Sequence, residues 1–345
     1  MQNFRTPTPP KTLLDAAAWG DLVAAQKFLA KGARPDQKDA QGWTALHHAV
    51  GYGQQSGADV ITSRTPVKGL VDALLKAGAD LQLADGVGGT ALTRALWYEH
   101  CSRKFADFLL QKGAPVSLWD ALWLGDTTKA LALVATANVK TTGPKSYTYL
   151  HLAAELGNVP VVERLLAQGA AVNARDKNGY TPLHHAIGGT PGEVLGSGKP
   201  YWHAYGPAKG REPLLALLLK SGANRDARGH DTPLPRQYTP LGCAILAERP
   251  ELMRVLLNAG ANPNEKGYDD DPLLFNAIET RNLAVVKVLL DAGADPRRKS
   301  AYGTTALETA KSTENPQIFA LVKVALQKQE RYFSIGIFPK KSDKP

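Results

Sequence analysis

The apolar positions of this chain follow one recurring pattern that is typical of a helix. A Leu-Leu pair is followed three residues later by Gly-Ala, as in Leu165-Leu166 and Gly169-Ala170. This predicts a helix that ends at the glycine, because a left-handed residue after a helix costs Gly little. The Gly-Ala dipeptides are Gly32-Ala33, Gly78-Ala79, Gly113-Ala114, Gly169-Ala170, Gly222-Ala223, Gly260-Ala261 and Gly293-Ala294.

A second motif, Thr-X-Leu followed by His or Gly, precedes several of these segments. It occurs at 44–47, 148–151, 181–184 and 239–242, and Thr148 lies 21 residues before Gly169. Thr is a favoured N-cap, Pro suits the first helical position, and the small Ala residues that follow let helices approach closely. The motif therefore predicts a slim inner helix, then the Leu-Leu outer helix, then a polar turn such as 36–42 or 173–179.

This unit resembles the ankyrin repeat, a turn plus two antiparallel helices in about 33 residues. The resemblance implies an all-α ankyrin-repeat solenoid of about nine repeats that forms a single elongated curved domain, because each repeat buries its apolar face only against its neighbours. The repeats begin near Lys11, Gln41, Gly88, Val116, Ser146, Gly179, Gln237, Asp271 and Gly303.

The register divides the chain into three parts. Residues 1–10 are expected to be an extended Pro-rich leader, residues 11–326 the array, and residues 327–345 an apolar and then basic tail. Insertions are expected near 54–66 and 190–211, since the Thr-to-Gly spacing is longer in repeats two and six. The link between repeats three and four is nearly absent, because Gly113-Ala114-Pro115 runs straight into Val116.

Charge and composition narrow the function classes. The net charge is +9, but residues 297–345 hold ten basic and four acidic residues, so the other 296 residues carry only +3. That near balance argues against nucleic-acid binding by the body of the chain. Two cysteines exclude a disulfide scaffold. Without a long apolar segment we expect no membrane span and a cytoplasmic location, or a periplasmic or secreted one if a signal segment was removed.

The histidines do not predict a metal site. The resemblance implies that His47, His151 and His184 are structural, with each imidazole bridging backbone groups. His48 and His185 follow directly and should point elsewhere, and adjacent helical residues do not converge on one ion. We therefore expect no metal and no cofactor.

Other motifs give no sign of catalysis. The chain has no GxSxG nucleophile motif and no Cys/His zinc spacing. The run 269–271 consists of three aspartates before Pro272, where carboxylates would complement the N-terminus of the next helix. We expect no enzymatic activity.

Large aromatic residues recur at two register positions. The first position is the end of the inner helix in repeats one to four. The second position is the residue directly before the Thr of the Thr-X-Leu motif, as in Trp43 and Tyr147. The resemblance implies that partners lie along the concave face, where these positions fall, and Trp and Tyr are common interface anchors. With the aromatic residues of the repeat-six insertion, the expected partner-binding residues are Trp19, Trp43, Tyr52, Trp97, Tyr98, Trp123, Tyr147, Tyr180, Tyr201, Trp202, Tyr205 and Tyr238.

These observations predict a non-enzymatic protein–protein interaction module. It would bind one specific protein through its concave aromatic face, as an inhibitor or immunity-type protein, and be monomeric alone. Three alternatives stay open: a multi-partner regulatory scaffold, a small-ligand binder that uses the repeat-six insertion, and binding of acidic surfaces through the basic C-terminal end. We expect another protein as partner and no nucleic acid.

Overall fold

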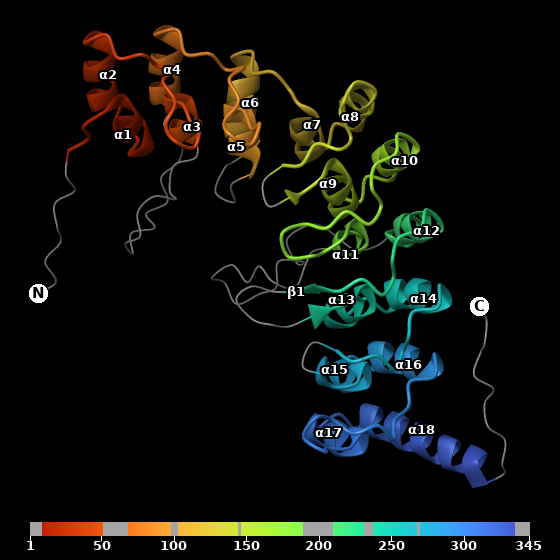
Figure 1. The fold of residues 1–345 in the computed structure, drawn as a ribbon. Helices are drawn as coiled ribbons and strands as arrows, with labels where there is room; N and C mark the ends of the chain where they lie inside the picture. The colour runs from red at the N-terminus through yellow and green to blue at the C-terminus, as the bar shows by residue number, and fades with distance from the viewer. Residues whose placement is uncertain are drawn as a thin grey trace, which may run out of the picture. The chain divides into compact units, whose positions relative to one another are not determined.

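The computed structural model describes residues 9–50, 68–97, 103–143, 146–188, 210–230, 237–267 and 270–334. Within these ranges the helices form nine successive pairs (Figure 1). This confirms the predicted alternation of inner and outer helices. By its internal contacts the chain divides into two compact units, Met1–Ala137 and Asn138–Pro345. That the two units form one continuous curved domain stays a prediction.

In the described part of the unit Met1–Ala137 there are four helix pairs. Inner helices α1, α3, α5 and α7 contact one another in sequence, and α2 packs against α4. The bounds are α1 Leu13–Ala18, α2 Leu22–Ala30, α3 Ala45–Val50, α4 Lys68–Lys76, α5 Ala91–Trp97, α6 Arg103–Gln111, α7 Leu118–Leu124 and α8 Thr127–Val134. Only four residues, 114–117, separate Gly113 from the start of α7 at Leu118, so the link between repeats three and four is short, as the register predicts.

The described residues of the unit Asn138–Pro345 form five helix pairs in two layers. Inner helices α9, α11, α13, α15 and α17 contact one another in order, and so do outer helices α10, α12, α14, α16 and α18 (Figure 1). The bounds are α9 Tyr149–Glu155, α10 Val159–Ala167, α11 Pro182–Ala186, α12 Glu212–Lys220, β1 Gly229–His230, β2 Gln237–Tyr238, α13 Pro240–Leu246, α14 Pro250–Asn258, α15 Leu273–Glu279, α16 Leu283–Asp291, α17 Ala306–Ser312 and α18 Pro316–Ser334.

Two predicted boundaries differ from the structure. The array was expected to end at residue 326, but α18 continues to Ser334. The stretch 327–331 consists of good helix formers and contains neither Gly nor Pro, so nothing in it stops the helix. Arg211, placed in the repeat-six insertion, instead precedes α12 and is buried. The repeat-two insertion lies outside the described residues.

Local signals explain the helix ends. The Thr148 hydroxyl caps α9, and the Asn158 side chain accepts from the Val161 N–H at the start of α10. The chain leaves α10 through Gly169, which has a φ of +81°. Leu150, Val161 and Leu165 are buried between the layers, and apolar burial contributes about 25 cal/mol per Å².

The links between pairs form short antiparallel contacts. In the link before α13, Gly229 of β1 pairs with Tyr238 of β2. Isolated bridges join Thr142 to Thr148, Lys266 to Pro272 and Lys299 to Thr305 in three other links. Gly229 also lies against the Tyr180 ring of the preceding repeat, so closely that a Cβ would overlap the ring carbons. The link therefore depends on glycine at this position.

Gly229→Ala is expected to destabilise the unit Asn138–Pro345 by about 2 kcal/mol, because the methyl group displaces the Tyr180 ring or the link. The control is Gly242→Ala in α13, where the nearest atoms to an added Cβ lie 3.5 Å and 3.8 Å away. The control should be neutral or slightly stabilising. Urea unfolding measures both variants, and equal stability of the two would contradict the predicted overlap.

Candidate functional site

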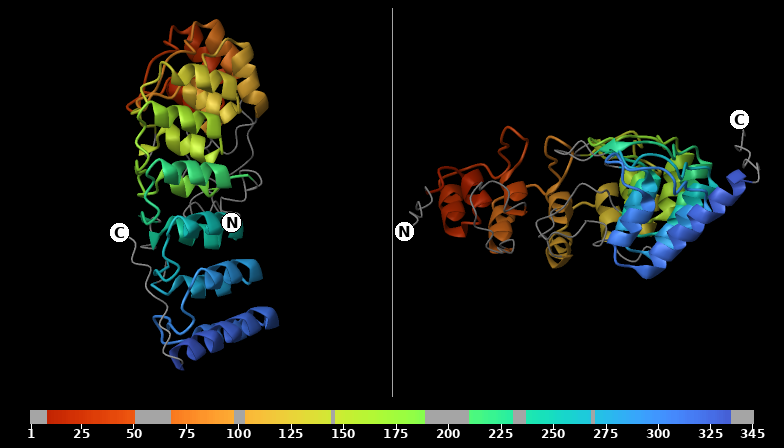
Figure 2. Two further views of the ribbon diagram at one scale, coloured as in Figure 1. Left: turned by 90° about the vertical axis from the view of Figure 1, so that its right-hand side faces the viewer. Right: turned by 90° about the horizontal axis from the view of Figure 1, so that it is seen from below.

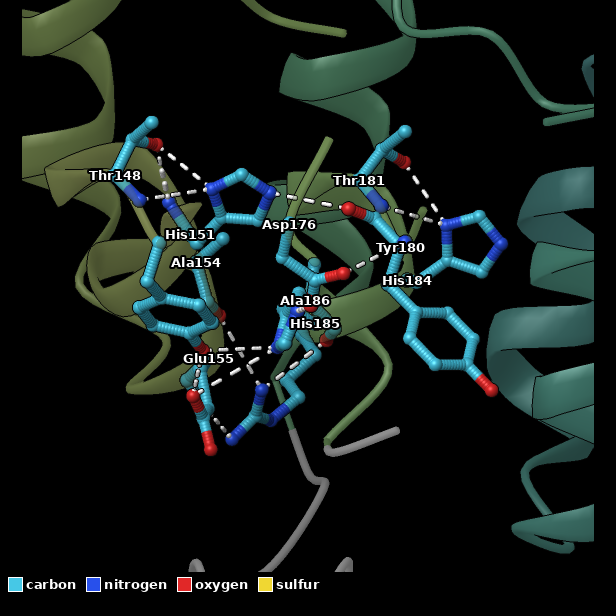
Figure 3. A network of polar contacts seen from close by, with 12 residues as sticks. Thr148, His151, Ala154, Glu155, Asp176, Tyr180, Thr181, His184, His185 and Ala186 are labelled. Carbon is cyan, nitrogen blue, oxygen red and sulfur yellow. Dashed lines mark hydrogen bonds and ion pairs between the residues drawn. The ribbon is translucent and has the colours of Figure 1, made fainter. Parts of the chain in front are cut away.

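The Thr-X-X-His motif forms one polar unit in three repeats. The backbone N–H of Thr148 donates to Nδ1 of His151 at 3.1 Å, so Nε2 carries the proton and donates to the Tyr180 carbonyl of the next repeat at 3.2 Å (Figure 3). His184 makes the same contacts with Thr181 at 3.1 Å and with the Tyr238 carbonyl at 3.2 Å. The prediction that these imidazoles bridge backbone groups is confirmed.

His47 makes the same bridge in the unit Met1–Ala137. Its Nδ1 accepts from the Thr44 N–H at 3.2 Å, and its Nε2 donates to the Gly89 carbonyl at 2.9 Å. Burial is the largest cause that lowers the pKa of this histidine. Burial also lowers the pKa of His151 and of His184 to about 3. All three bridges therefore hold neutral imidazoles.

A second polar position follows His47 and His184, but not His151, and was not predicted. This position lies four residues after the Thr. Its side chain pairs with an aspartate that lies five residues before the Thr, in the turn of the same repeat. Nε2 of His48 lies 2.7 Å from Oδ2 of Asp39, and Nε2 of His185 lies 3.0 Å from Oδ2 of Asp176. The recurrence of Asp at this spacing was the available sequence signal.

Repeat three uses Arg94 at the same position. Its guanidinium forms a buried ion pair with Asp85. Asp85 also accepts from the backbone N–H groups of Val87 and Gly89, at 3.0 Å and 2.9 Å, which shapes the turn. In these three repeats the pair between the aspartate and the His or Arg thus joins the turn to the inner helix that follows it.

A connected polar cluster lies between repeats five and six (Figure 3). Nδ1 of His185 lies 2.9 Å from the Tyr147 hydroxyl, which also donates to the Glu155 carboxylate. Burial raises the pKa of Asp176, but the hydrogen bond and charge of His185 outweigh it, and the pKa is lowered overall. This cluster joins a phenol, an imidazole and two carboxylates in one chain of contacts.

Arg211 closes this cluster from the start of α12. It donates to the Glu155 carbonyl at 2.8 Å, the Ala186 carbonyl at 3.1 Å and the Ala154 carbonyl at 3.4 Å. These carbonyls lie at the C-terminal ends of α9 and α11, where helical carbonyls lack partners and the helix dipole favours a cation. Arg211 therefore joins the ends of two inner helices.

The chemistry of this cluster is structural. Its members satisfy one another: His185 bonds to Tyr147 and Asp176, and Arg211 bonds to backbone carbonyls. Within the described ranges, no three His, Cys, Asp or Glu side chains are placed to hold a metal ion. Asp271 of the acidic run precedes α15, and its carboxylate accepts from the Ala301 N–H of the next link at 2.5 Å.

The aromatic residues that precede the Thr serve contacts between repeats. Tyr180 is 0% exposed and Tyr238 is 5% exposed, so the prediction that these two rings lie on a binding surface is wrong. The turn folds each ring inward against the next repeat. Trp43 is half-buried, with the Arg94 guanidinium 5.0 Å above its ring. Tyr147 stacks on His151, with ring centroids 5.1 Å apart.

The aromatic residues at the inner-helix ends are placed differently. Trp19 at the end of α1 is 38% exposed, and Trp123 in α7 is half-buried. Trp97 is the last residue of α5, but the placement of its side chain is outside the described part. The other predicted binding residues also lie outside the described residues: Tyr52, Tyr98, Tyr201, Trp202 and Tyr205.

Stacked helix pairs, Thr-His bridges and paired links define a helical-repeat protein. No helix in the described part is both long and apolar enough to cross a membrane. The family model for ankyrin repeats matches residues 13–120, 118–194 and 203–300. The chain belongs to the ankyrin-repeat family, whose members are generally non-catalytic protein–protein interaction modules.

Known proteins show the same relationship. The probable 26S proteasome regulatory subunit p28 of Saccharomyces cerevisiae is 30% identical over 156 residues, 44% of this chain and 51% of that protein. The putative ankyrin repeat protein FPV223 of fowlpox virus is 30% identical over 123 residues, 33% of this chain and 86% of that protein. Human protein phosphatase 1 regulatory subunit 27 is 28% identical over 135 residues, 39% of this chain and 75% of that protein. The chain thus spans about half the length of the yeast protein.

Proposed function

We propose that this protein binds one specific protein partner through the surface around Trp19 and Trp123. The exposure of Trp19 carries the proposal. Ala16 and Ala17 of α1 are fully buried, whereas Trp19, two positions after Ala17, is 38% exposed. A large ring left in solvent contributes little to folding, but it offers area with few rotamers to freeze on binding.

The family relationship supports this proposal. Two relatives carry the name of a regulatory subunit, one of the 26S proteasome and one of protein phosphatase 1. By analogy, the partner of this chain would be an enzyme or toxin whose activity changes on binding, and the role would be that of an inhibitor or immunity-type protein. A repeat array with a rigid face loses little conformational entropy on association, which favours a tight complex.

The test is affinity capture with three baits from a lysate of the source cells. They are the wild type, the Trp19→Ala/Trp123→Ala variant and Tyr302→Ala. Tyr302, 93% exposed in the last link, is a control for loss of an exposed ring. The double variant is expected to bind the partner at least about tenfold more weakly, because interface tryptophans often contribute more than about 1.4 kcal/mol each. Circular dichroism checks that all baits fold.

Each outcome separates the candidate functions. A partner retained by the wild type and Tyr302→Ala, but lost from the double variant, supports the proposed surface. Equal retention by all three baits contradicts it. Many weak partners would favour the multi-partner scaffold, and a complete absence of partners would favour the small-ligand alternative.

A further inference from the structure

The links of the unit Asn138–Pro345 follow one edge of its stack (Figure 2). Hydrogen bonds join neighbouring links along this edge. Arg175 donates to the Arg228 carbonyl at 3.1 Å, Arg228 donates to the Lys266 carbonyl at 3.4 Å, and the His230 N–H donates to the Asn178 carbonyl at 2.8 Å. We call this row of links the link edge. Its residues from different repeats form one connected surface.

The acidic side chains of the link edge mostly bond within the protein. Asp176 accepts from His185 at 3.0 Å, Glu265 accepts from the Thr239 hydroxyl at 2.5 Å, and Asp271 accepts from the Ala301 N–H at 2.5 Å. Asp271 is buried, and the other two are half-buried. Asp295 is half-buried and forms an ion pair with Arg297 at 2.9 Å. These four carboxylates therefore all bond to groups of this chain.

The basic side chains of the same links are more exposed, and Arg298 also donates to the Asn264 carbonyl. Lys140, Lys177, Lys266, Arg298 and Lys299 are all exposed. The link edge is therefore more basic than its sequence, because its carboxylates are more buried than its basic side chains. The net charge of +3 on residues 1–296 argued against a basic face, but Lys140, Lys177 and Lys266 of that part are exposed on this edge.

The links of the unit Met1–Ala137 are a contrast within the same chain. In the links before α3 and α5, Arg34 and Lys38 are accompanied by Asp36, Asp39, Asp80 and Asp85. The basic edge thus belongs to the unit Asn138–Pro345 and is no general feature of the repeat.

We propose that the link edge binds an acidic segment of a protein partner, with the exposed lysines and arginine facing its carboxylates. This inference rests on the proposed function, since it names the chemistry of a protein partner. It differs from the sequence-based alternative, which placed acidic binding at the C-terminal end. Complementary charge gives such a contact specificity and a fast association rate.

The arrangement of charges favours a protein over a nucleic acid. Exposed Asp226 and Asp270 interrupt the row, and they lie close to cations: Asp226 is 3.8 Å from Arg225, and Asp270 is 3.5 Å from Lys266. A phosphate backbone presents a continuous negative charge and would meet both carboxylates. A polypeptide carries carboxylates at separate positions, so it can avoid them.

The test uses the purified full chain and a short fluorescent poly-L-glutamate peptide as probe. The edge variant is Lys177→Ala/Lys266→Ala/Lys299→Ala. The control is Lys220→Ala/Lys287→Ala/Lys323→Ala, which removes the same charge from exposed positions on α12, α16 and α18. Fluorescence anisotropy is recorded at about 50 mM and about 300 mM salt, because screening weakens exposed charge pairs.

The edge variant is expected to bind the peptide about tenfold more weakly than the wild type, because each exposed pair contributes about 0.5 kcal/mol. The control should stay within about twofold, and high salt should weaken wild-type binding. Equal losses in both variants, no wild-type binding at low salt, or tighter binding of duplex DNA would each overturn the proposal. Because the assay needs no captured partner and leaves Trp19 and Trp123 intact, its failure is distinguishable from failure of the proposed function.

Discussion

Acidification from pH 7 to pH 5 is expected to lower the free energy of unfolding of the unit Asn138–Pro345 by about 4 kcal/mol through His151 and His184. Both histidines bridge backbone groups as neutral imidazoles. Burial, the largest cause, lowers the pKa of each from the ordinary 6.5 to about 3. Each histidine therefore lowers the free energy of unfolding at pH values where the unfolded chain binds a proton and the folded chain does not.

The direction of the effect follows from proton counting. Above the ordinary pKa of 6.5, the folded and unfolded chains both hold neutral imidazoles, and the stability is fully present. As the pH falls from 6.5 toward 3, only the unfolded chain binds protons, so unfolding becomes easier by about 1.4 kcal/mol per pH unit for each histidine. Since pH 5 lies well above 3, the folded chain still refuses the proton there.

Urea unfolding at pH 7 and pH 5 checks this prediction on His151→Gln/His184→Gln. This variant removes both titrations, so it should lose about 4 kcal/mol less than the wild type between the two pH values, whatever its stability at pH 7. Burial raises the pKa of Glu265, so this residue opposes the loss of stability at low pH. Its contribution is the same in both proteins and cancels in the comparison. The control is His230→Gln, because His230 is exposed. Equal pH losses in the double variant and the wild type would contradict the neutral bridges.

Arg211→Leu is expected to lower the free energy of unfolding by about 3–5 kcal/mol, because removing one partner leaves buried polar groups unsatisfied. Arg211 is buried and donates to the carbonyls of Ala154, Glu155 and Ala186. Leucine fills part of the space but donates nothing. The ends of α9 and α11 would then lose their shared cation as well as their hydrogen bonds.

The matched control is Arg254→Leu, which removes the same charge from an exposed position on α14. It should change stability by less than about 0.5 kcal/mol. Arg211→Lys should recover only part of the loss, because one ammonium group cannot reproduce the guanidinium fork on three carbonyls. Urea unfolding measures all three variants. A loss below about 1 kcal/mol for Arg211→Leu would show that the carbonyls find other partners.

Much of the fold could be predicted because its signals are local and repeated. Thr148 and Gly169 mark the two ends of one helix pair, and the structure places a cap at the first and a positive φ at the second. The short link after Gly113 was predicted from the missing turn residues. The bridging role of His151 came with the resemblance and is confirmed by its contacts.

Contacts between distant residues could not be predicted in the same way. Arg211 lies 56 positions after Glu155 and follows an insertion, so no spacing rule joins them. Tyr180 and Tyr238 occupy a register position that looks exposed in a single repeat. Their burial requires the next repeat to cover them, as Gly229 does for Tyr180.

The sequence by itself determined the repeat and the order of its helices, because capping, helix termination and apolar spacing act within one repeat. Only the tertiary structure decided which charges and rings face solvent. The stacking of links turns Asp176, Glu265 and Asp271 inward and leaves Lys177, Lys266 and Lys299 exposed. Burial depends on neighbouring repeats, and a carboxylate can be buried only where the stack supplies its hydrogen-bond donors.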